Sequence, residues 1–274
     1  MPEIVDLEVM SENIVRKVGK EKLKKINFRV EKVLRNADPR DVSDSLEGRS
    51  LLGISRISKV LIFSFENKAK LAIHLMLHGN FCWKDEAKNE KGVVCEMDFG
   101  PIAALFIKDW SSWMKIELED PSKNIFSDLL KQKYGIDPLA EDFTLENFSK
   151  LLSAVPRKGI KVVLMDQSLV SGIGNAYADE ILFDAKIHPK SHVKGILEKN
   201  KAEQLWKSIN KVLKESVEIV RDMSGGVSVT EQDRDFMKVY RKSGQKCPGC
   251  GYMIVQMKVN ARDTFVCEKC QTLL

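Results

Sequence analysis

The chain has 274 residues and a mass of 31.1 kDa, which is enough for two ordinary domains and a small appendage. Its composition, 43% hydrophobic and 30% charged, is that of a globular protein and excludes the disordered and collagen-like classes. No apolar run approaches the roughly 20 residues that a bilayer span requires, and the first ten residues include three acids. We therefore expect no membrane association and a cytoplasmic protein, or a nuclear one in a cell with a nucleus.

The net charge of +5 is concentrated at one end of the chain. The segment from Arg234 to Leu274 carries eight basic and three acidic side chains, which accounts for the whole excess. A compact basic segment predicts a polyanionic partner, nucleic acid first, because binding to phosphates releases counterions. A solvated basic tail is the alternative that charge alone leaves open.

Hydrophobic periodicity predicts a helix followed by strands in the first part of the chain. Apolar residues at helical spacing indicate a helix over residues 4–18, which begins almost at the amino terminus. Short strand-like runs follow at 26–30, 60–65, 71–77 and 93–99, and this pattern is typical of an antiparallel sandwich. Residues 122–143 interrupt the strand pattern and indicate a domain connection.

Helical periodicity dominates the second part. Thr144 is expected to cap one helix, and apolar positions over 202–219 predict a longer amphipathic helix. Between them, the turn Gly172-Ile173-Gly174 leads into Asn175 and a further helix. Backbone N–H groups at such a turn are suited to binding a phosphate, although this pattern is commonly only a tight turn.

Four of the six cysteines form two Cys-x-x-Cys pairs separated by sixteen residues. This spacing predicts a zinc site, because two facing turns present four thiolates as a tetrahedron. A set of four thiolates leaves no open position for a substrate, so the ion is expected to be structural. Disulfides are the weaker interpretation for a reducing compartment. The expected ligands are Cys247, Cys250, Cys267 and Cys270.

Two strands are predicted between the cysteine pairs, and the turn that joins them places Arg262 at a hairpin tip. An arginine there can enter a DNA groove or bind a phosphate bidentately. A solvated surface arginine is the alternative, and the local positive charge favours nucleic acid.

Pro2 follows the initiator Met1, and removal of Met1 would leave a secondary amine. An α-amino group is partly neutral at physiological pH and can form a Schiff base with a sugar aldehyde. Glu3 could donate and accept protons beside it. From these two residues alone, a proline that simply starts a helix is the simpler interpretation.

The order of these features resembles the formamidopyrimidine-DNA glycosylase and endonuclease VIII family of base-excision repair enzymes. The resemblance covers essentially the whole chain. MPEIVDLEV is similar to the opening of the family, YGIDPLAEDF to its interdomain segment, DQSLVSGIGNAYADEILFDAKIHP to its helix-two-turn-helix signature, and CPGC through CEKCQ to its zinc finger.

The resemblance implies an α+β, multidomain fold with three parts. An amino-terminal helix and antiparallel β-sandwich would form a catalytic domain over 1–132, a helix-two-turn-helix DNA-binding domain would follow over 133–233, and a zinc finger β-hairpin would occupy 234–274. The family's activity is bifunctional. The proline nitrogen displaces an oxidised base, holds the sugar as an imine, and the strand is then cleaved by β- and δ-elimination.

The resemblance also implies roles for individual residues. Pro2 would be the nucleophile, Glu3 the acid that assists ring opening, and Lys59 the residue that holds the lesion phosphate and assists elimination. The expected DNA contacts are phosphate clamps and side chains that fill the space of the extruded base. The clamps are His74, Asn175 and Arg262, and the filling residues are Leu77 and Trp113.

The sequence departs from the family pattern at several of these positions. Leu77 stands where the family usually has methionine, and Ser112-Trp113 where it has an Arg-Phe pair. Ser112 cannot contact the opposite base as arginine would. The opening motif has Val5 and Asp6 in place of proline and glutamate, and the connection over 225–240 lacks much of the loop that covers oxidised purines. Oxidised pyrimidines, formamidopyrimidines and abasic sites are therefore the expected lesions.

Three functions agree with parts of the sequence. The leading one is a monomeric DNA glycosylase and lyase that acts on double-stranded DNA with oxidised bases or abasic sites and is associated with the nucleoid. The second is a protein of the same fold that binds damaged DNA without efficient base excision. The third, a zinc-ribbon protein that binds RNA or other proteins, does not explain Pro2-Glu3.

Overall fold

The computed structural model describes residues 1–119 and 133–274. The chain divides into two compact units, each of which is described by itself. The first comprises Met1–Gln132 with Val217–Gln232, and the second comprises Lys133–Ser216 with Asp233–Leu274. Among the helices of the described ranges, none is long and apolar enough to cross a membrane.

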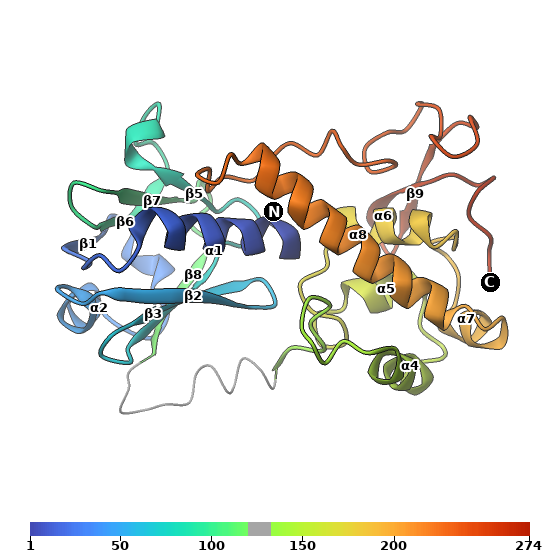
Figure 1. The fold of residues 1–274 in the computed structure, drawn as a ribbon, viewed down its shortest axis with the longest axis horizontal. Helices are drawn as coiled ribbons and strands as arrows, with labels where there is room; N and C mark the ends of the chain where they lie inside the picture. The colour runs from blue at the N-terminus through green and yellow to red at the C-terminus, as the bar shows by residue number, and fades with distance from the viewer. Residues whose placement is uncertain (120–132) are drawn as a thin grey trace. The chain divides into compact units, whose positions relative to one another are not determined.

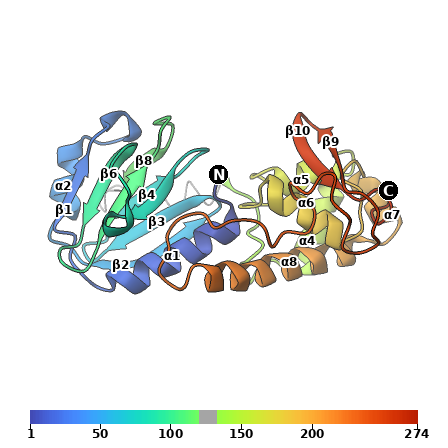
Figure 2. The same cartoon turned by 90° about the horizontal axis from the view of Figure 1, so that it is seen from above.

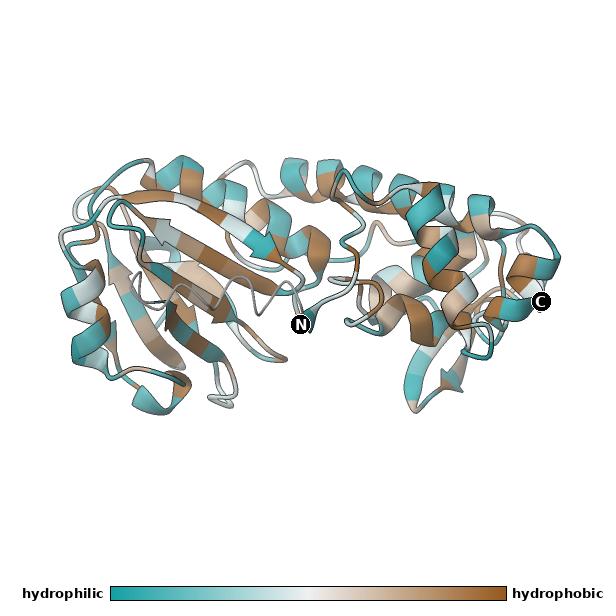
Figure 3. Ribbon diagram, turned by 90° about the horizontal axis from the view of Figure 1, so that it is seen from below, coloured by the Kyte–Doolittle hydropathy of each residue, from teal (hydrophilic) through white to brown (hydrophobic). Residues whose placement is uncertain are grey.

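The first unit is built on two four-stranded antiparallel sheets (Figures 1 and 2). Inward-facing side chains of both sheets form one core, and several of the strands are brown along much of their length in the hydropathy colouring of Figure 3. One sheet has the order β1 (Lys25–Phe28), β6 (Val93–Asp98), β7 (Ala104–Lys108), β5 (Asn80–Trp83). The other has the order β2 (Leu51–Ile57), β3 (Val60–Phe65), β4 (Lys70–His74), β8 (Lys115–Glu119).

Helices cover the edges of this sandwich. Helix α1 (Ile4–Val18) packs against β2, and its apolar side joins the core of the sheets. Helix α2 (Pro39–Leu46) begins with a reciprocal capping box between Asp38 and Asp41 and packs against β1. Two short 3-10 turns complete the set, at Glu31–Val33 and Lys84–Glu86.

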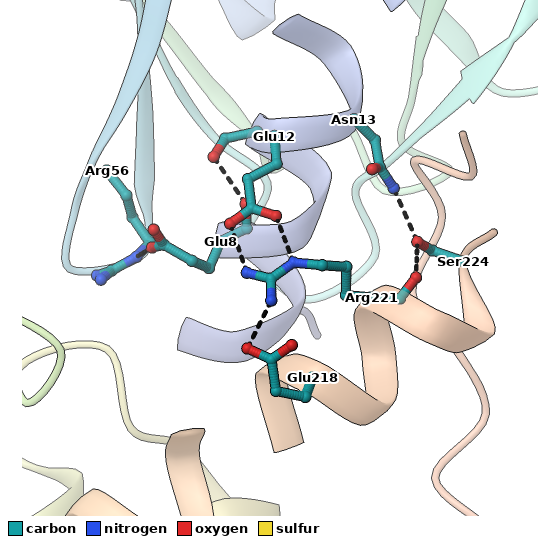
Figure 4. A network of polar contacts seen from close by, with 8 residues as sticks. Glu8, Glu12, Asn13, Arg56, Glu218, Arg221 and Ser224 are labelled. Atoms are coloured by element: carbon teal, nitrogen blue, oxygen red, sulfur yellow. Dashed lines mark hydrogen bonds and ion pairs between the residues drawn. The ribbon is translucent and has the colours of Figure 1, made fainter. Parts of the chain in front are cut away.

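Ion pairs attach the polar side of α1 to the carboxyl-terminal end of helix α8 (Ala202–Met223) (Figure 4). Arg221 binds Glu12 with two parallel bonds, Nε to Oε2 and Nη2 to Oε1, each 2.9 Å long. Its remaining nitrogen, Nη1, donates to Glu218 at 2.6 Å. The next residue of α1, Asn13, donates to Ser224 Oγ and to the carbonyl of Ser228.

The second unit is helical and ends in a β-hairpin. Thr144 Oγ1 accepts the amide of Asn147 and caps α4 as the sequence predicts. The hairpin turns at Asn260-Ala261, where both residues have positive φ, as a tight two-residue turn requires. The elements are α4 (Leu145–Ala154), α5 (Ile160–Met165), α6 (Asn175–Asp184), α7 (Val193–Glu198), the first part of α8, β9 (Val255–Val259) and β10 (Arg262–Val266).

Most predicted elements are confirmed, but the strands expected over 26–30, 71–77 and 93–99 end earlier, at Phe28, His74 and Asp98. The helix over 4–18 and the strand over 60–65 have the predicted bounds. The strand expected over 71–77 ends at His74, because Nδ1 of its imidazole accepts the amide of Met76 and the chain turns there with positive φ. Part of the predicted connection over 122–143 lies outside the described residues.

We expect the bidentate pair between Glu12 and Arg221 to stabilise the first unit by about 1 kcal/mol at low salt, because both side chains are about one-third exposed. A double-mutant cycle with Glu12→Gln and Arg221→Met, measured by urea unfolding, should give this coupling, and 1 M salt should reduce it. The exposed pair Glu146–Lys150 in α4 is the matched control, with an expected coupling below about 0.5 kcal/mol. Equal couplings for the two pairs would contradict the prediction.

Candidate functional site

The amino terminus is held tightly at the start of α1. Pro2 and Glu3 are both buried, and Glu3 is the residue that caps the helix. The amide of Glu3 donates to Asp6 Oδ2 at 2.7 Å, so the shorter acid of this chain still completes the capping box. The amino group of Met1 lies 3.3 Å from Glu231 Oε2. The capping box therefore anchors Glu3, the residue that directly follows Pro2.

Arg56 connects this helix to the turn that carries Lys59. Its Nε donates to Glu8 Oε2 at 2.8 Å (Figure 4). Its Nη1 donates to the carbonyl of Ser58 at 3.1 Å. Ser58 adopts a left-handed conformation in the tight turn between β2 and β3, and the following Lys59 is 8% exposed. The sequence prediction included Lys59 but missed Arg56, although Arg56 lies only three residues earlier.

The other predicted residues of the first unit lie at the ends of its strands. His74 is half-buried at the end of β4, where its ring holds the following turn. That turn exposes 48% of Leu77. Trp113 is 55% exposed, and its ring lies 6.3 Å from the ring of His78, next in the chain after Leu77. The structure thus places Trp113 near His78, the residue that follows Leu77.

The segment before Trp113 is shaped by Asp109, a residue that the sequence analysis did not select. Asp109 is 2% exposed. Its Oδ1 accepts the amide and hydroxyl of Ser111, and its Oδ2 accepts the amide of Met114 at 2.8 Å. Burial opposes the charged form, but the bonds from Met114 and Ser111 outweigh it and lower the pKa of Asp109. We call residues 109–114 the Asp109 loop.

In the second unit, the glycine turn is locked by Gln167. Its Oε1 accepts the amide of Gly172, and its Nε2 donates to the carbonyl of Ile173, both at 2.8 Å. Gly172 has φ +85°, which favours glycine. Helix α6 then begins at Asn175, whose Nδ2 donates to the carbonyl of Asp263 at 2.8 Å.

Asn175 and Arg262, which are 87 residues apart in the sequence, are therefore neighbours in the structure. Asn175 binds the residue that follows Arg262, and its Oδ1 is buried without a hydrogen-bond partner in the described part of the chain. Arg262 itself is exposed, at the first position of β10 beside the hairpin turn. The two predicted phosphate contacts thus meet where the hairpin joins α6.

A buried ion pair beneath them was missed by the sequence analysis. Lys161 Nζ lies 2.6 Å from Asp179 Oδ1 and 2.7 Å from Thr264 Oγ1, and Asp179 Oδ2 accepts the amide of Phe265. Both charged side chains are at most 2% exposed. Burial raises the pKa of Asp179 to about 7, and Lys161 opposes this shift. The pair joins α5 and α6 to β10.

The four predicted cysteines come together and fit a zinc ion. Their Sγ atoms all lie within 4.8 Å of one another, with 3.8 Å between Cys247 and Cys270 and 3.5 Å between Cys250 and Cys267. These separations agree with a tetrahedron whose Zn–S bonds are about 2.3 Å long. The amide of Gly249 also points at Cys247 Sγ, at 3.4 Å. With four thiolate ligands, the ion would hold the fold of the finger and leave no position for a reactant.

Family models match three consecutive parts of the chain: the formamidopyrimidine-DNA glycosylase N-terminal domain over residues 1–111, the formamidopyrimidine-DNA glycosylase H2TH domain over 134–228, and a zinc finger found in this enzyme and in isoleucyl-tRNA synthetase over 244–273. The formamidopyrimidine-DNA glycosylase of Mycoplasmopsis pulmonis is 30% identical over 286 residues, which cover 99% of this chain and 98% of that protein. The chain belongs to the formamidopyrimidine-DNA glycosylase family.

Solved structures of family members agree with this assignment. A complex of the Lactococcus lactis formamidopyrimidine-DNA glycosylase with DNA containing an oxidised pyrimidine has a TM-score of 0.86 and 30% identity, over 98% of this chain and 99% of that one. A complex of the same enzyme with DNA containing an abasic site has a TM-score of 0.86 and 29% identity, with the same coverage. The predicted α+β fold and the structural zinc ion are confirmed by the family assignment together with the four-cysteine cluster.

Replacing Lys161 with methionine should destabilise the second unit by about 3–5 kcal/mol at neutral pH, because it leaves Asp179 buried without its cation. The loss should shrink as the pH falls toward 4. Removing the cation raises the folded-state pKa of Asp179 further. A buried carboxyl with a raised pKa makes the folded state less stable as the pH rises, because the carboxyl must then be ionised in the interior. Urea unfolding between pH 4.5 and 8 measures this. The double variant Lys161→Met/Asp179→Leu should recover much of the loss, and a loss that is independent of pH would contradict the assignment.

Replacing Asp109 with asparagine should destabilise the first unit by about 1–3 kcal/mol, because an amide nitrogen cannot accept the N–H groups that one carboxylate oxygen now accepts. In the wild type, this contribution is present above the ordinary carboxyl pKa and is lost as the pH falls through the lower folded-state value. Asp98→Asn is the control, because Asp98 accepts one amide through one oxygen, which asparagine retains. Equal unfolding free energies for the two variants would contradict the role of Asp109.

Proposed function

We propose that this chain is a DNA glycosylase and abasic-site lyase whose nucleophile is the nitrogen of Pro2 after removal of Met1. The observation that carries the proposal is the buried, capped Pro2-Glu3 terminus in a chain that matches formamidopyrimidine-DNA glycosylases from end to end. The amine attacks C1′ of the damaged nucleotide, and the bond to the base breaks with transfer of a proton to the base. The sugar ring then opens to an imine, and successive β- and δ-elimination release the strand ends.

Glu3 and Lys59 are proposed to assist this chemistry. Glu3 is 4% exposed and directly follows the nucleophile, so its carboxyl can protonate the sugar oxygen as the ring opens. Lys59 lies on the turn that Arg56 ties to α1, and its ammonium is suited to the phosphate beside the lesion. Arg56 itself is a positioning residue in this scheme.

The remaining predicted residues are proposed to hold bent DNA with the damaged nucleotide extruded. Extrusion costs a few kcal/mol, which contacts to phosphates and a side chain in the vacated space must offset. We assign the phosphate contacts to His74, Asn175 and Arg262. Leu77 and Trp113 are assigned to the vacated space, because both are exposed and Trp113 lies near His78, the residue that follows Leu77.

The preferred lesions are proposed to be oxidised pyrimidines, formamidopyrimidines and abasic sites. The connection over 225–240 is short, so it offers little surface to enclose an oxidised purine. Ser112 has a side chain too short to contact an opposite base, so discrimination between opposite bases should be weak. We further propose that the enzyme acts as a monomer in the compartment that contains the cell's DNA, and that zinc takes no part in the reaction.

A second candidate, binding of damaged DNA without excision, is motivated by the residues that depart from the family pattern, Leu77 and Ser112-Trp113. Its chemical basis would be retention of Met1, because the nitrogen of Pro2 is then acylated and cannot act as a nucleophile. The intact mass of the purified protein distinguishes the two states. Retention of Met1 in the purified protein would support the binding function.

Borohydride reduction in the presence of duplexes with an abasic site, 5-hydroxycytosine or 8-oxoguanine tests the proposal. We expect a covalent adduct that peptide mapping places at Pro2, strongest with abasic DNA and weakest with 8-oxoguanine. Pro2→Gly should reduce the adduct at least tenfold, whereas Pro101→Gly in the exposed turn between β6 and β7 should leave it unchanged. Tight binding without an adduct on any duplex would refute the lyase assignment.

A further inference from the structure

The Asp109 loop exposes two of the four tryptophans of this chain, and the proposed function uses only one of them. Trp110 is 60% exposed and Trp113 is 55% exposed. The other two are held by hydrogen bonds: the indole N–H of Trp83 donates to the carbonyl of Val227, and that of Trp206 donates to the carbonyl of Phe143. A large aromatic side chain that is mostly in solvent marks a binding surface more often than a core position.

The two exposed indoles lie on opposite flanks of β7. At Lys108, this strand pairs with β5 through Asn80 on one side and with β6 through Val93 on the other. The ring of Trp113 lies 6.3 Å from that of His78, at a tilt of 43°, and His78 lies just before β5. Trp110 lies over Gly92, just before β6, where a Cβ atom would approach its indole to 3.2 Å. Two strand spacings correspond to about 10 Å, so the two rings can contact different nucleotides.

The backbone that presents Trp110 is already ordered. Asp109 accepts three hydrogen bonds within the loop, and its own amide donates to the carbonyl of Gly92 at 2.8 Å. A ligand that stacks on Trp110 therefore has little loop entropy to overcome. The small residue at position 92 also allows the indole to lie flat against the backbone.

The charged groups around Trp110 favour a polyanion. Lys91 Nζ lies 5.4 Å from the centre of its ring, and Lys108 is the last residue of β7. Two carboxylates close to this site in the sequence are already engaged, because Asp109 is buried in its own loop and Glu90 binds Arg29 Nη1 at 2.8 Å. An aromatic face beside ammonium groups is the arrangement that binds an unstacked nucleic acid base and its phosphate.

We propose that Trp110 stacks on an unpaired DNA base beside the lesion, with Lys91 at the adjoining phosphate. This contact is separate from the one assigned to Leu77 and Trp113. This inference rests on the proposed function because it takes damaged DNA as the ligand. It does not require that the protein excises a base. Trp110 would contact the DNA on the opposite side of β7 from Trp113. This contact would add to DNA binding in a chain whose Ser112 is too short to reach the opposite base.

Affinity for a duplex that contains a tetrahydrofuran abasic analogue tests the stacking. Base–aromatic stacking is typically lost on alanine substitution at a cost that corresponds to about 5- to 150-fold in affinity. We expect Trp110→Ala to bind at least fivefold more weakly and Trp110→Phe within about twofold of wild type. Ile102→Ala is the control. It removes an exposed apolar side chain from the turn between β6 and β7, at the end of these strands opposite to Trp110, and it should bind like wild type.

The stacked base can be located by removing bases one at a time. A set of duplexes carries a second abasic site, placed at a different position around the lesion in each duplex. At one of these positions, wild type and Trp110→Ala should bind with equal affinity. Wild-type affinity of Trp110→Ala, an equal loss in Ile102→Ala, or no coupled position would overturn the proposal, and the last would favour a protein partner at this surface. Borohydride trapping at Pro2, measured in parallel, reports the excision chemistry separately, so its failure leaves the binding result interpretable.

Discussion

The first unit depends on the fixed position of helix α1. Burial of its apolar side against the sheets sets where the helix lies, and two arginines bind acids on its polar side, Arg56 at Glu8 and Arg221 at Glu12. A nucleophile on a chain terminus would ordinarily be among the most mobile groups of a protein. Here the capping box anchors Glu3, and the two ion pairs hold the helix that begins directly after it.

The second unit holds a small hairpin whose two strands differ in burial. The residues of β9 alternate between exposed and half-exposed, whereas Thr264, Phe265 and Val266 of β10 are buried, and Phe265 belongs to a hydrophobic cluster with Phe183 and Val239. Four thiolates around an ion organise one end of it. The buried Lys161–Asp179 pair and the bond from Asn175 attach the other end to α5 and α6. Arg262 therefore has a rigid base although its own side chain is exposed.

Features that depend on local sequence were predictable, and those that depend on tertiary contacts were not. Residues close together in the sequence determine the helix over 4–18, the Thr144 cap and the spacing within each cysteine pair. Strands β2, β5, β7 and β8 were missed, because β5, β7 and β8 have only four or five residues and the seven residues of β2 do not alternate regularly in burial. Arg56 and Asp109 look like ordinary polar residues until the fold supplies their partners. The roles proposed for Pro2, Lys59 and Trp113 came from the family resemblance and stay predictions.

The connection between the end of α8 and the zinc finger is fixed at both of its ends. Val229 is buried in the core of the sandwich, and the Glu180 carboxylate accepts the consecutive amides of Lys238, Val239 and Tyr240. Extra residues inserted between these anchors would add only the slowly growing entropy of a longer loop, about 0.6 kcal/mol for each doubling of its length. This segment can therefore gain or lose a covering loop in evolution or by grafting, and the range of accepted bases can change while the catalytic framework remains the same.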